Sequence, residues 1–300
     1  MRGAIAVSLL VAVCSATVAA QWAKFPTPGL PRDEKGQVRM DAPPPRTADG
    51  KPDLSGLWVR ADRDPLPEQI AKIVGNRQSG EAIPVERPVE AFPPDPGSPP
   101  LATFWDIGRN LPGGLPLTPW AAGLRTQRMA EDSKDNPDAN CLPMGITQFH
   151  MQPQPRKIVQ TPQLIFIEYE ANYGIRHIYT DGRQLPTQGE PQPFWYGYSV
   201  GRWDGDTLIV ETNNLRGAEQ GPFDGWLDVN GAPYSDAARF IERFRRPSVG
   251  KLEIDVTIDD PKSYAKPFTV RINQRLMPDE ELIEFVCNEN QQFRKRVKVD

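Results

Sequence analysis

The second half of the chain, from residue 157 onward, consists of short runs in which apolar and polar residues alternate, separated by turn residues. In the run from 252 to 258 every second residue is aliphatic, as expected for a strand that buries one face. The pair Asp204-Gly205 joins two such runs and is typical of a tight hairpin, because that turn needs positive φ. With no helix between the runs, the pattern favours an antiparallel meander, which removes its exposed edges by closing into a barrel.

The sequence therefore predicts a mainly β fold, an antiparallel up-and-down, lipocalin-like β-barrel. A β-sandwich is the main alternative. A barrel of about eight strands has room inside only for side chains or one small ligand. The runs expected to form the strands are 157–171, as one or two strands, and 175–179, 194–203, 206–213, 238–245, 252–258, 268–276 and 282–287.

The first twenty residues have the features of a secretory signal peptide. Arg2 supplies a positive charge, residues 4–13 are apolar but too few to span a bilayer, and small residues precede Gln21. We expect cleavage after Ala20 and a secreted or periplasmic protein, with a buried helix or membrane anchor as the alternative. No other stretch is long and apolar enough for a transmembrane span.

Residues 21–50 are rich in proline and lack an apolar pattern, so we expect an extended leader. One domain should occupy 51–300, with the barrel meander at 157–290. Before the meander, residues 52–156 should form an irregular cover with one strand and one short helix at 118–131.

Two observations support that helix. Thr118 is a suitable N-cap and Pro119 suits the first helical position. Trp120, Leu124 and Met129 could share one face of it.

The mature chain would keep two cysteines, Cys141 and Cys287, because Cys14 leaves with the signal peptide. In an oxidising compartment this number favours a single disulfide, with two buried thiols as the alternative. Since the chain has only 2 histidines and both thiols would be oxidised, a Cys/His metal site is not expected.

The formal net charge is -4, and basic residues are interspersed with acidic ones. Without a basic stripe, nucleic acid is not an expected partner. The sequence also lacks a phosphate-binding glycine loop and a nucleophile elbow, so no cofactor is expected and the partner should be a small molecule.

Several phrases carry a family resemblance. They are PDLSGLW at 52–58, the segment around Cys141-Leu142-Pro143, RHIYTDGR at 176–183, GYSVGRWDGDTLIVET at 197–212, the stretch 235–246 that ends in IERFRR, and VTIDDPKSYAKPF at 256–268. The chain resembles a large group of secreted proteins from soil and environmental bacteria, and the GRWDGDTLIVET block is the most specific part. The resemblance implies export and fold, and no particular chemistry. The series of hairpins and short strands in the meander is also similar to that of lipocalin and nitrobindin barrels.

Polar residues on inward strand faces are the main candidates for chemistry, because burial costs free energy unless they are paired. Alternation leaves open whether Glu168 and Glu170 face the interior or solvent. Glu242 lies between two phenylalanines and should face inward, where an arginine is its natural partner; a structural ion pair is the alternative. The candidates for acid-base or charge-stabilising roles are Glu168, Glu170, Arg176, His177, Tyr179 and Glu242.

A second set could contact a ligand. Aromatic residues offer stacking surface, although they serve equally well as barrel core. The candidates are His150, Trp195, Tyr196, Tyr198, Trp203, Glu211, Arg239 and Arg243. His150 lies in a proline-rich stretch where a surface loop is the simpler interpretation.

These residues support three hypotheses. The first is a secreted or periplasmic barrel that binds a small apolar or aromatic molecule. The second is a cofactor-free lyase, isomerase or hydrolase in the same pocket, with a carboxylate or histidine as base and an arginine or tyrosine to stabilise negative charge. The third is an envelope structural protein without a ligand.

Overall fold

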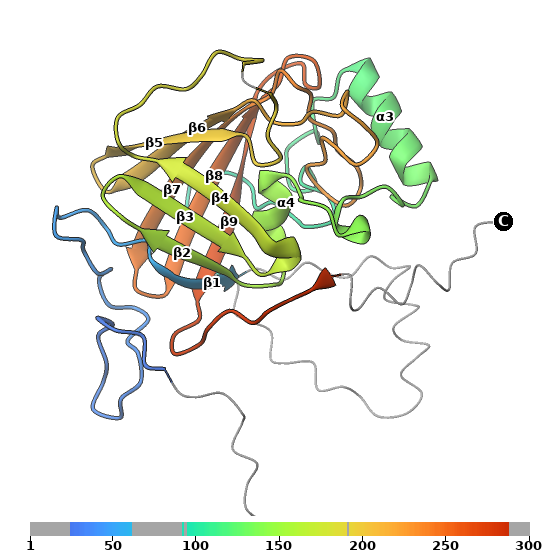
Figure 1. Ribbon diagram of the computed structural model, residues 1–300. Helices are drawn as coiled ribbons and strands as arrows, with labels where there is room; N and C mark the ends of the chain where they lie inside the picture. The colour runs from blue at the N-terminus through green and yellow to red at the C-terminus, as the bar shows by residue number, and fades with distance from the viewer. Residues whose placement is uncertain (1–24, 62–91, 93–94, 191, 288–300) are drawn as a thin grey trace, which may run out of the picture.

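A computed structural model of the chain describes residues 25–61, 92, 95–190 and 192–287. The predicted signal peptide lies outside these residues. In the described part of the chain, the strands close into one barrel (Figure 1) in the order β1 to β9. The strands are β1 (Gly56–Arg60), β2 (Arg156–Gln160), β3 (Leu164–Tyr169), β4 (Gly174–Tyr179), β5 (Tyr198–Asp204), β6 (Thr207–Asn213), β7 (Arg239–Ser248), β8 (Lys251–Asp259) and β9 (Phe268–Leu276). The predicted β-barrel is confirmed.

Neighbouring strands are antiparallel except at one seam. β4 and β5 run parallel and pair only at Ile178–Ser199 and Tyr179–Val200, because the connection from 180 to 197 carries the chain back to the same end. Elsewhere the tight turns that the sequence indicates are present, and Gly205 adopts φ +57° between β5 and β6.

Two details of the strand prediction were wrong. Residues 282–287 do not form a strand, because β1 pairs with β9 and occupies the edge that this segment would have used. β1 in turn belongs to the barrel rather than to the irregular cover, since it also pairs with β2 and so closes the ring.

The barrel interior is filled mainly by alternating aliphatic and aromatic side chains. Ile165 and Ile167 on β3, Phe240 and Phe244 on β7, and Val256 on β8 are each 1% exposed or less. Alternation therefore assigns the inner face of each of these strands, and burial of these side chains drives closure.

The helix α3 (Pro119–Ala130) begins as predicted, with the Thr118 hydroxyl accepting from the Ala121 amide at 3.3 Å. The side chains of Trp120 and Met129 are exposed, at 42% and 49%. The helix packs instead through Ala121 and Arg128, whose guanidinium lies 4.0 Å from the Trp226 ring centre.

A second, six-residue helix, α4 (Ile146–Met151), is buried along its whole length, and Figure 1 shows it between the strands and α3. Short 3-10 turns lie at Asp138–Asn140 and Ala171–Tyr173. Ile146, Phe149 and Met151 of α4 belong to the same hydrophobic cluster as the inward side chains of the strands.

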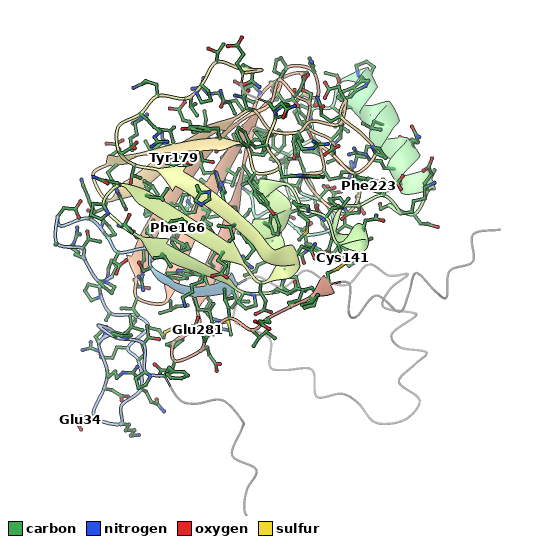
Figure 2. All side chains as sticks on the ribbon, in the orientation of Figure 1. Glu34, Cys141, Phe166, Tyr179, Phe223 and Glu281 are labelled. Atoms are coloured by element: carbon green, nitrogen blue, oxygen red, sulfur yellow. A yellow bond between two sulfur atoms is a disulfide. The ribbon has the colours of Figure 1, made fainter. Side chains whose placement is uncertain are left out.

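The predicted disulfide between Cys141 and Cys287 is present and closes a loop of 146 residues in sequence separation. Cys141 follows the 3-10 turn that leads into α4, and Figure 2 labels it close to the C-terminal segment. The bond therefore joins the approach to α4 to the segment that follows β9.

The described part of the leader docks on the barrel. Arg32 donates to Asp279 at 2.9 Å, Arg46 pairs with Asp206 at 2.7 Å, and the Gly250 amide donates to the Met40 carbonyl at 2.8 Å. In the described ranges, no helix has both the length and the apolar character needed to cross a membrane.

Candidate functional site

The barrel interior holds one carboxylate at its centre, Glu242 on β7. Its side chain is fully buried between Phe240 and Phe244, which is the inward position that the alternation predicts. Oε1 of Glu242 lies 2.9 Å from Nε2 of His150 and 3.0 Å from Nη1 of Arg176, while Oε2 pairs with Nη2 of Arg176. The carboxylate thus joins α4 to β4 across the barrel.

Arg176 is itself anchored by hydroxyl groups from two further strands. Its guanidinium donates to Oγ of Ser199 at 3.1 Å and to Oγ1 of Thr212 at 2.9 Å, and these two hydroxyls lie 2.8 Å apart. All three side chains are 1% exposed or less. A bidentate arginine with this many partners keeps the Glu242 carboxylate in a single orientation.

Charge and burial act in opposite directions on this carboxylate. Burial alone would raise the pKa of Glu242, but the charge of Arg176 and hydrogen bonds from His150 and Arg176 lower it to about 2. Burial lowers the pKa of His150 despite the neighbouring carboxylate. At neutral pH the pair is therefore an ionised glutamate and a neutral imidazole.

This charge state fixes the tautomer of the imidazole. A carboxylate only accepts hydrogen bonds, so Nε2 of His150 carries the proton and Nδ1 presents a lone pair. Nδ1 is buried, and no described residue gives it a hydrogen bond. The base-capable nitrogen of His150 is thus unpaired inside the barrel.

A second arginine, Arg156 on β2, lies beside His150. It donates to the carbonyl of His150 at 2.6 Å and to the carbonyl of Gln152 at 2.7 Å. It is 1% exposed and, within the described residues, has no carboxylate partner, while its Nε has no hydrogen-bond partner. Burial lowers the pKa of Arg156 to about 10, and the group still carries its charge at neutral pH.

Tyr169 on β3 completes the group. It is the cross-strand partner of Arg156, and its ring centre lies 6.0 Å from that of His150. Burial raises the pKa of its hydroxyl to about 12. That hydroxyl lies near Arg176 but without hydrogen-bond geometry to any described residue. Tyr169 is thus a buried, protonated donor.

A hollow of about 350 Å³ lies outside this cluster, on the seam between β4 and β5. Its apolar side chains are unusually accessible, with Ile175 51% and Phe194 42% exposed. Tyr179 and Tyr198 stack at 5.2 Å, and Arg183 lies 3.8 Å from the Tyr179 ring centre. We call this site the aromatic hollow; it is lined by Ile175, His177, Tyr179, Phe194, Trp195, Tyr196, Gly197, Tyr198 and Ser199.

The aromatic hollow and the buried cluster share a wall. Tyr196 lines the hollow, and its ring lies 5.3 Å from Phe149, which stacks on Tyr169 at 4.4 Å. A Cβ atom at Gly174 would lie only 3.0 Å from the Tyr196 hydroxyl and 2.8 Å from Phe149. The missing side chain at 174 therefore lets Tyr196 approach the barrel interior.

The structure brings together several candidates from the sequence and separates others. Glu242, Arg176 and His150 meet in the interior, while five further candidates line the aromatic hollow: His177, Tyr179, Trp195, Tyr196 and Tyr198.

The remaining candidates lie elsewhere. Glu168 points to solvent because Ile165, Ile167 and Tyr169 form the inner face of β3. Glu170 accepts from the Ile283 amide beyond the strand end, and Trp203 packs at the edge of the core.

Three charged candidates, Glu211, Arg239 and Arg243, lie on the outer face of the barrel. Glu211 and Arg239 form an ion pair with each other there, and Arg243 is exposed. On β7 the side chains of Phe240 and Phe244 point inward, so Arg239 and Arg243, which alternate with them, point outward.

Sequence reasoning missed Arg156 and Tyr169. A signal existed for both, because Arg156 is two residues from the buried Ile158, and Tyr169 is in phase with Ile165 and Ile167. The inward position of His150 had no such signal, since its helix is short and its burial depends on the barrel around it.

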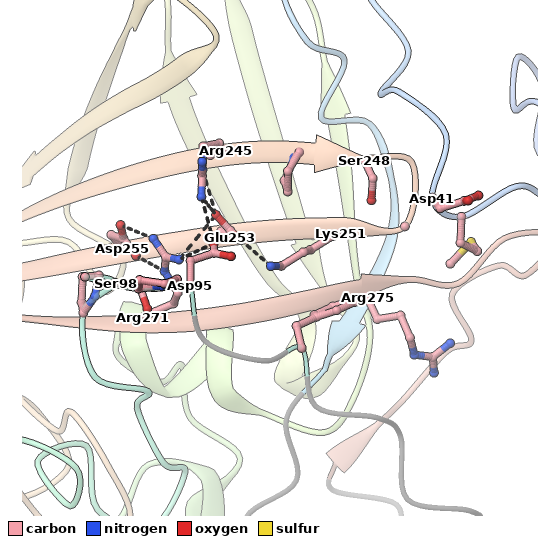
Figure 3. A pocket seen from close by; sticks show the side chains of 17 residues that line it. Asp41, Asp95, Ser98, Arg245, Ser248, Lys251, Glu253, Asp255, Arg271 and Arg275 are labelled. Atoms are coloured by element: carbon pink, nitrogen blue, oxygen red, sulfur yellow. Dashed lines mark hydrogen bonds and ion pairs between the residues drawn. The ribbon is translucent and has the colours of Figure 1, made fainter.

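A larger hollow of about 1070 Å³ lies on the outer face of β7, β8 and β9 (Figure 3). Its central carboxylate, Glu253, is 1% exposed and is paired with Arg245 at 2.8 Å and with Lys251 at 2.7 Å. None of the candidate residues from the sequence lines this hollow.

No three His, Cys, Asp or Glu side chains in the described ranges are grouped so that they could hold a metal ion. Comparison of the chain with known protein families, with curated proteins and with solved structures gives no match.

Proposed function

We propose that this protein is a small-molecule-binding barrel, exported from the cytoplasm, that takes a flat aromatic or apolar molecule in the aromatic hollow. The observation that carries the proposal is a concave surface where Ile175 and Phe194 stay half exposed. Its volume of about 350 Å³ matches a ligand of one or two rings.

The hollow is also preorganised. Arg183 donates to the Tyr198 hydroxyl at 2.9 Å while its guanidinium covers the Tyr179 ring, so both tyrosines are held before a ligand arrives. Rigid aromatic walls lose little conformational entropy on binding, which favours affinity. The disulfide is compatible with an oxidising compartment.

Titration calorimetry with para-cresol and para-hydroxyphenylacetate tests the proposal. We expect binding to the mature protein, and a loss of at least tenfold in affinity for Tyr198→Ala. Trp120→Ala is the matched control, because Trp120 is an exposed aromatic residue on α3, away from the hollow. Equal affinity in the two variants would refute this location for the site.

A further inference from the structure

Three buried polar atoms without partners belong to residues that are neighbours in the fold. They are Nδ1 of His150, Nε of Arg156 and the hydroxyl of Tyr169, and none has a hydrogen-bond partner among the described residues. Arg156 and Tyr169 are cross-strand neighbours, and both contact His150. Since buried polar groups in folded proteins are nearly always paired, three unpaired atoms on neighbouring residues indicate a site for a polar ligand group.

The three atoms differ in what they can do. Nδ1 of the neutral His150 accepts a proton, whereas Nε of Arg156 and the hydroxyl of Tyr169 donate hydrogen bonds. A base beside two donors suits a reaction that removes a proton from carbon and places negative charge on a carbonyl oxygen.

The charge balance of the barrel core fits the same reaction. Around His150 lie two guanidinium groups, Arg156 and Arg176, and one ionised carboxylate, Glu242. One positive charge is therefore left without a buried counter-charge, which is unfavourable in a low-dielectric interior. An enolate formed beside Arg156 would neutralise it.

We propose that His150, Arg156 and Tyr169 form a proton-transfer site for small aromatic ketones with an acidic C–H bond next to the carbonyl. The inference rests on the proposed function, because the substrate would first bind in the aromatic hollow and reach the site past Tyr196. The protein would then be a cofactor-free isomerase or lyase.

The step is balanced without any co-reactant. The C–H bond breaks, its proton moves to Nδ1 of His150, and its electron pair forms the C=C bond of the enolate. The carbonyl π electrons move to oxygen, where Arg156 and Tyr169 donate hydrogen bonds. Glu242 stabilises the imidazolium, and reversal returns a proton to carbon. Glu242 and Arg176 are positioning residues, since they act through His150.

The test uses para-hydroxybenzyl methyl ketone in D2O, followed by proton NMR. Saturation transfer from the protein reports binding, and loss of the CH2 signal between ring and carbonyl reports deuterium exchange. We expect wild-type protein to exchange these protons faster than an equal concentration of free imidazole. His150→Gln should bind the ketone but exchange no faster than that background.

Tyr169→Phe keeps the aromatic ring and should reduce the exchange rate on the order of 100-fold, the usual effect of removing one donor to an oxyanion. Trp120→Ala should exchange at the wild-type rate. Binding without exchange in the wild-type protein would overturn the proton-transfer site and leave the proposed function standing. Neither binding nor exchange would overturn both.

A measurement on the wild-type protein tests the proposal even if the variants fail to fold. Nitrogen-15 NMR of the His150 ring should show a proton on Nε2 and a bare Nδ1 at pH 7. A proton on Nδ1, or a charged imidazole, would contradict the role of His150 as base.

Discussion

The inner and outer faces of the barrel each hold a buried carboxylate, Glu242 on β7 and Glu253 on β8, and their surroundings differ. Glu253 faces outward among cations, of which Arg245 is 49% exposed, so solvent can screen the network. Glu242 is sealed inside, with Arg176 and a neutral histidine. Solvent therefore reaches the cations around Glu253, whereas Glu242 and both of its partners, His150 and Arg176, are at most 1% exposed.

Replacing the inner carboxylate should have the largest effect on the free energy of unfolding. Glu242→Gln leaves the buried Arg176 without a counter-charge, so the free energy of unfolding should fall by about 3–5 kcal/mol. Urea denaturation of the mature protein measures the change. A loss below 1 kcal/mol would show that the inner network is as loosely coupled to stability as a surface pair.

Removing the disulfide should have the second largest effect on the free energy of unfolding. Replacing Cys141 and Cys287 by serine should lower the free energy of unfolding by roughly 2–5 kcal/mol, because the bond restricts a long loop in the unfolded chain. Differential scanning calorimetry would show this as a drop in Tm. An unchanged Tm would mean that the approach to α4 is held by other contacts.

Lowering the pH should reduce the free energy of unfolding through the buried carboxylate of Glu242. The unfolded chain protonates Glu242 below pH 4.5, whereas the folded protein keeps it ionised down to about pH 2, so acid favours unfolding in this window. The shift corresponds to about 3 kcal/mol of stability, fully present above pH 4.5. The lowered pKa of His150 acts in the same direction, beginning below pH 6.5. Stability curves against pH for wild-type protein and Glu242→Gln should converge toward pH 2; parallel curves would be inconsistent with the lowered pKa.

The smallest effect is expected on the outer face. Arg245→Ala removes one of several cations around Glu253, and Lys251 remains 2.7 Å from the carboxylate. The free energy of unfolding should fall by about 1 kcal/mol or less, as for other solvent-screened pairs. A loss comparable with that of Glu242→Gln would contradict the expectation that the inner ion pair contributes more to stability than the outer one.

The sequence predicted the barrel because alternation and turn residues are local signals. The hairpin between β5 and β6 was confirmed, although its turn residues are Gly205 and Asp206 rather than Asp204 and Gly205. The N-cap at Thr118 was also confirmed, because it too is a local signal. Residues 282–287 have a strand-like pattern, but local pattern cannot show that β1 already occupies the adjoining edge of β9.

The candidate site was only partly predictable. Alternation on β7 gave the inward position of Glu242, but β4 and β7 are not neighbours, so its partner Arg176 follows only from the closed barrel. His150 depends on α4, whose burial comes from the surrounding strands. Contacts across the interior are non-local, and no short stretch of sequence encodes them.

A crystal structure of the mature protein soaked with para-hydroxybenzyl methyl ketone would show where the ligand binds. We expect the ring against Tyr198 in the aromatic hollow, or deeper, with the carbonyl oxygen near Arg156 and Tyr169. Density for the ketone only in the charged hollow around Glu253, with the seam between β4 and β5 empty, would contradict this expectation.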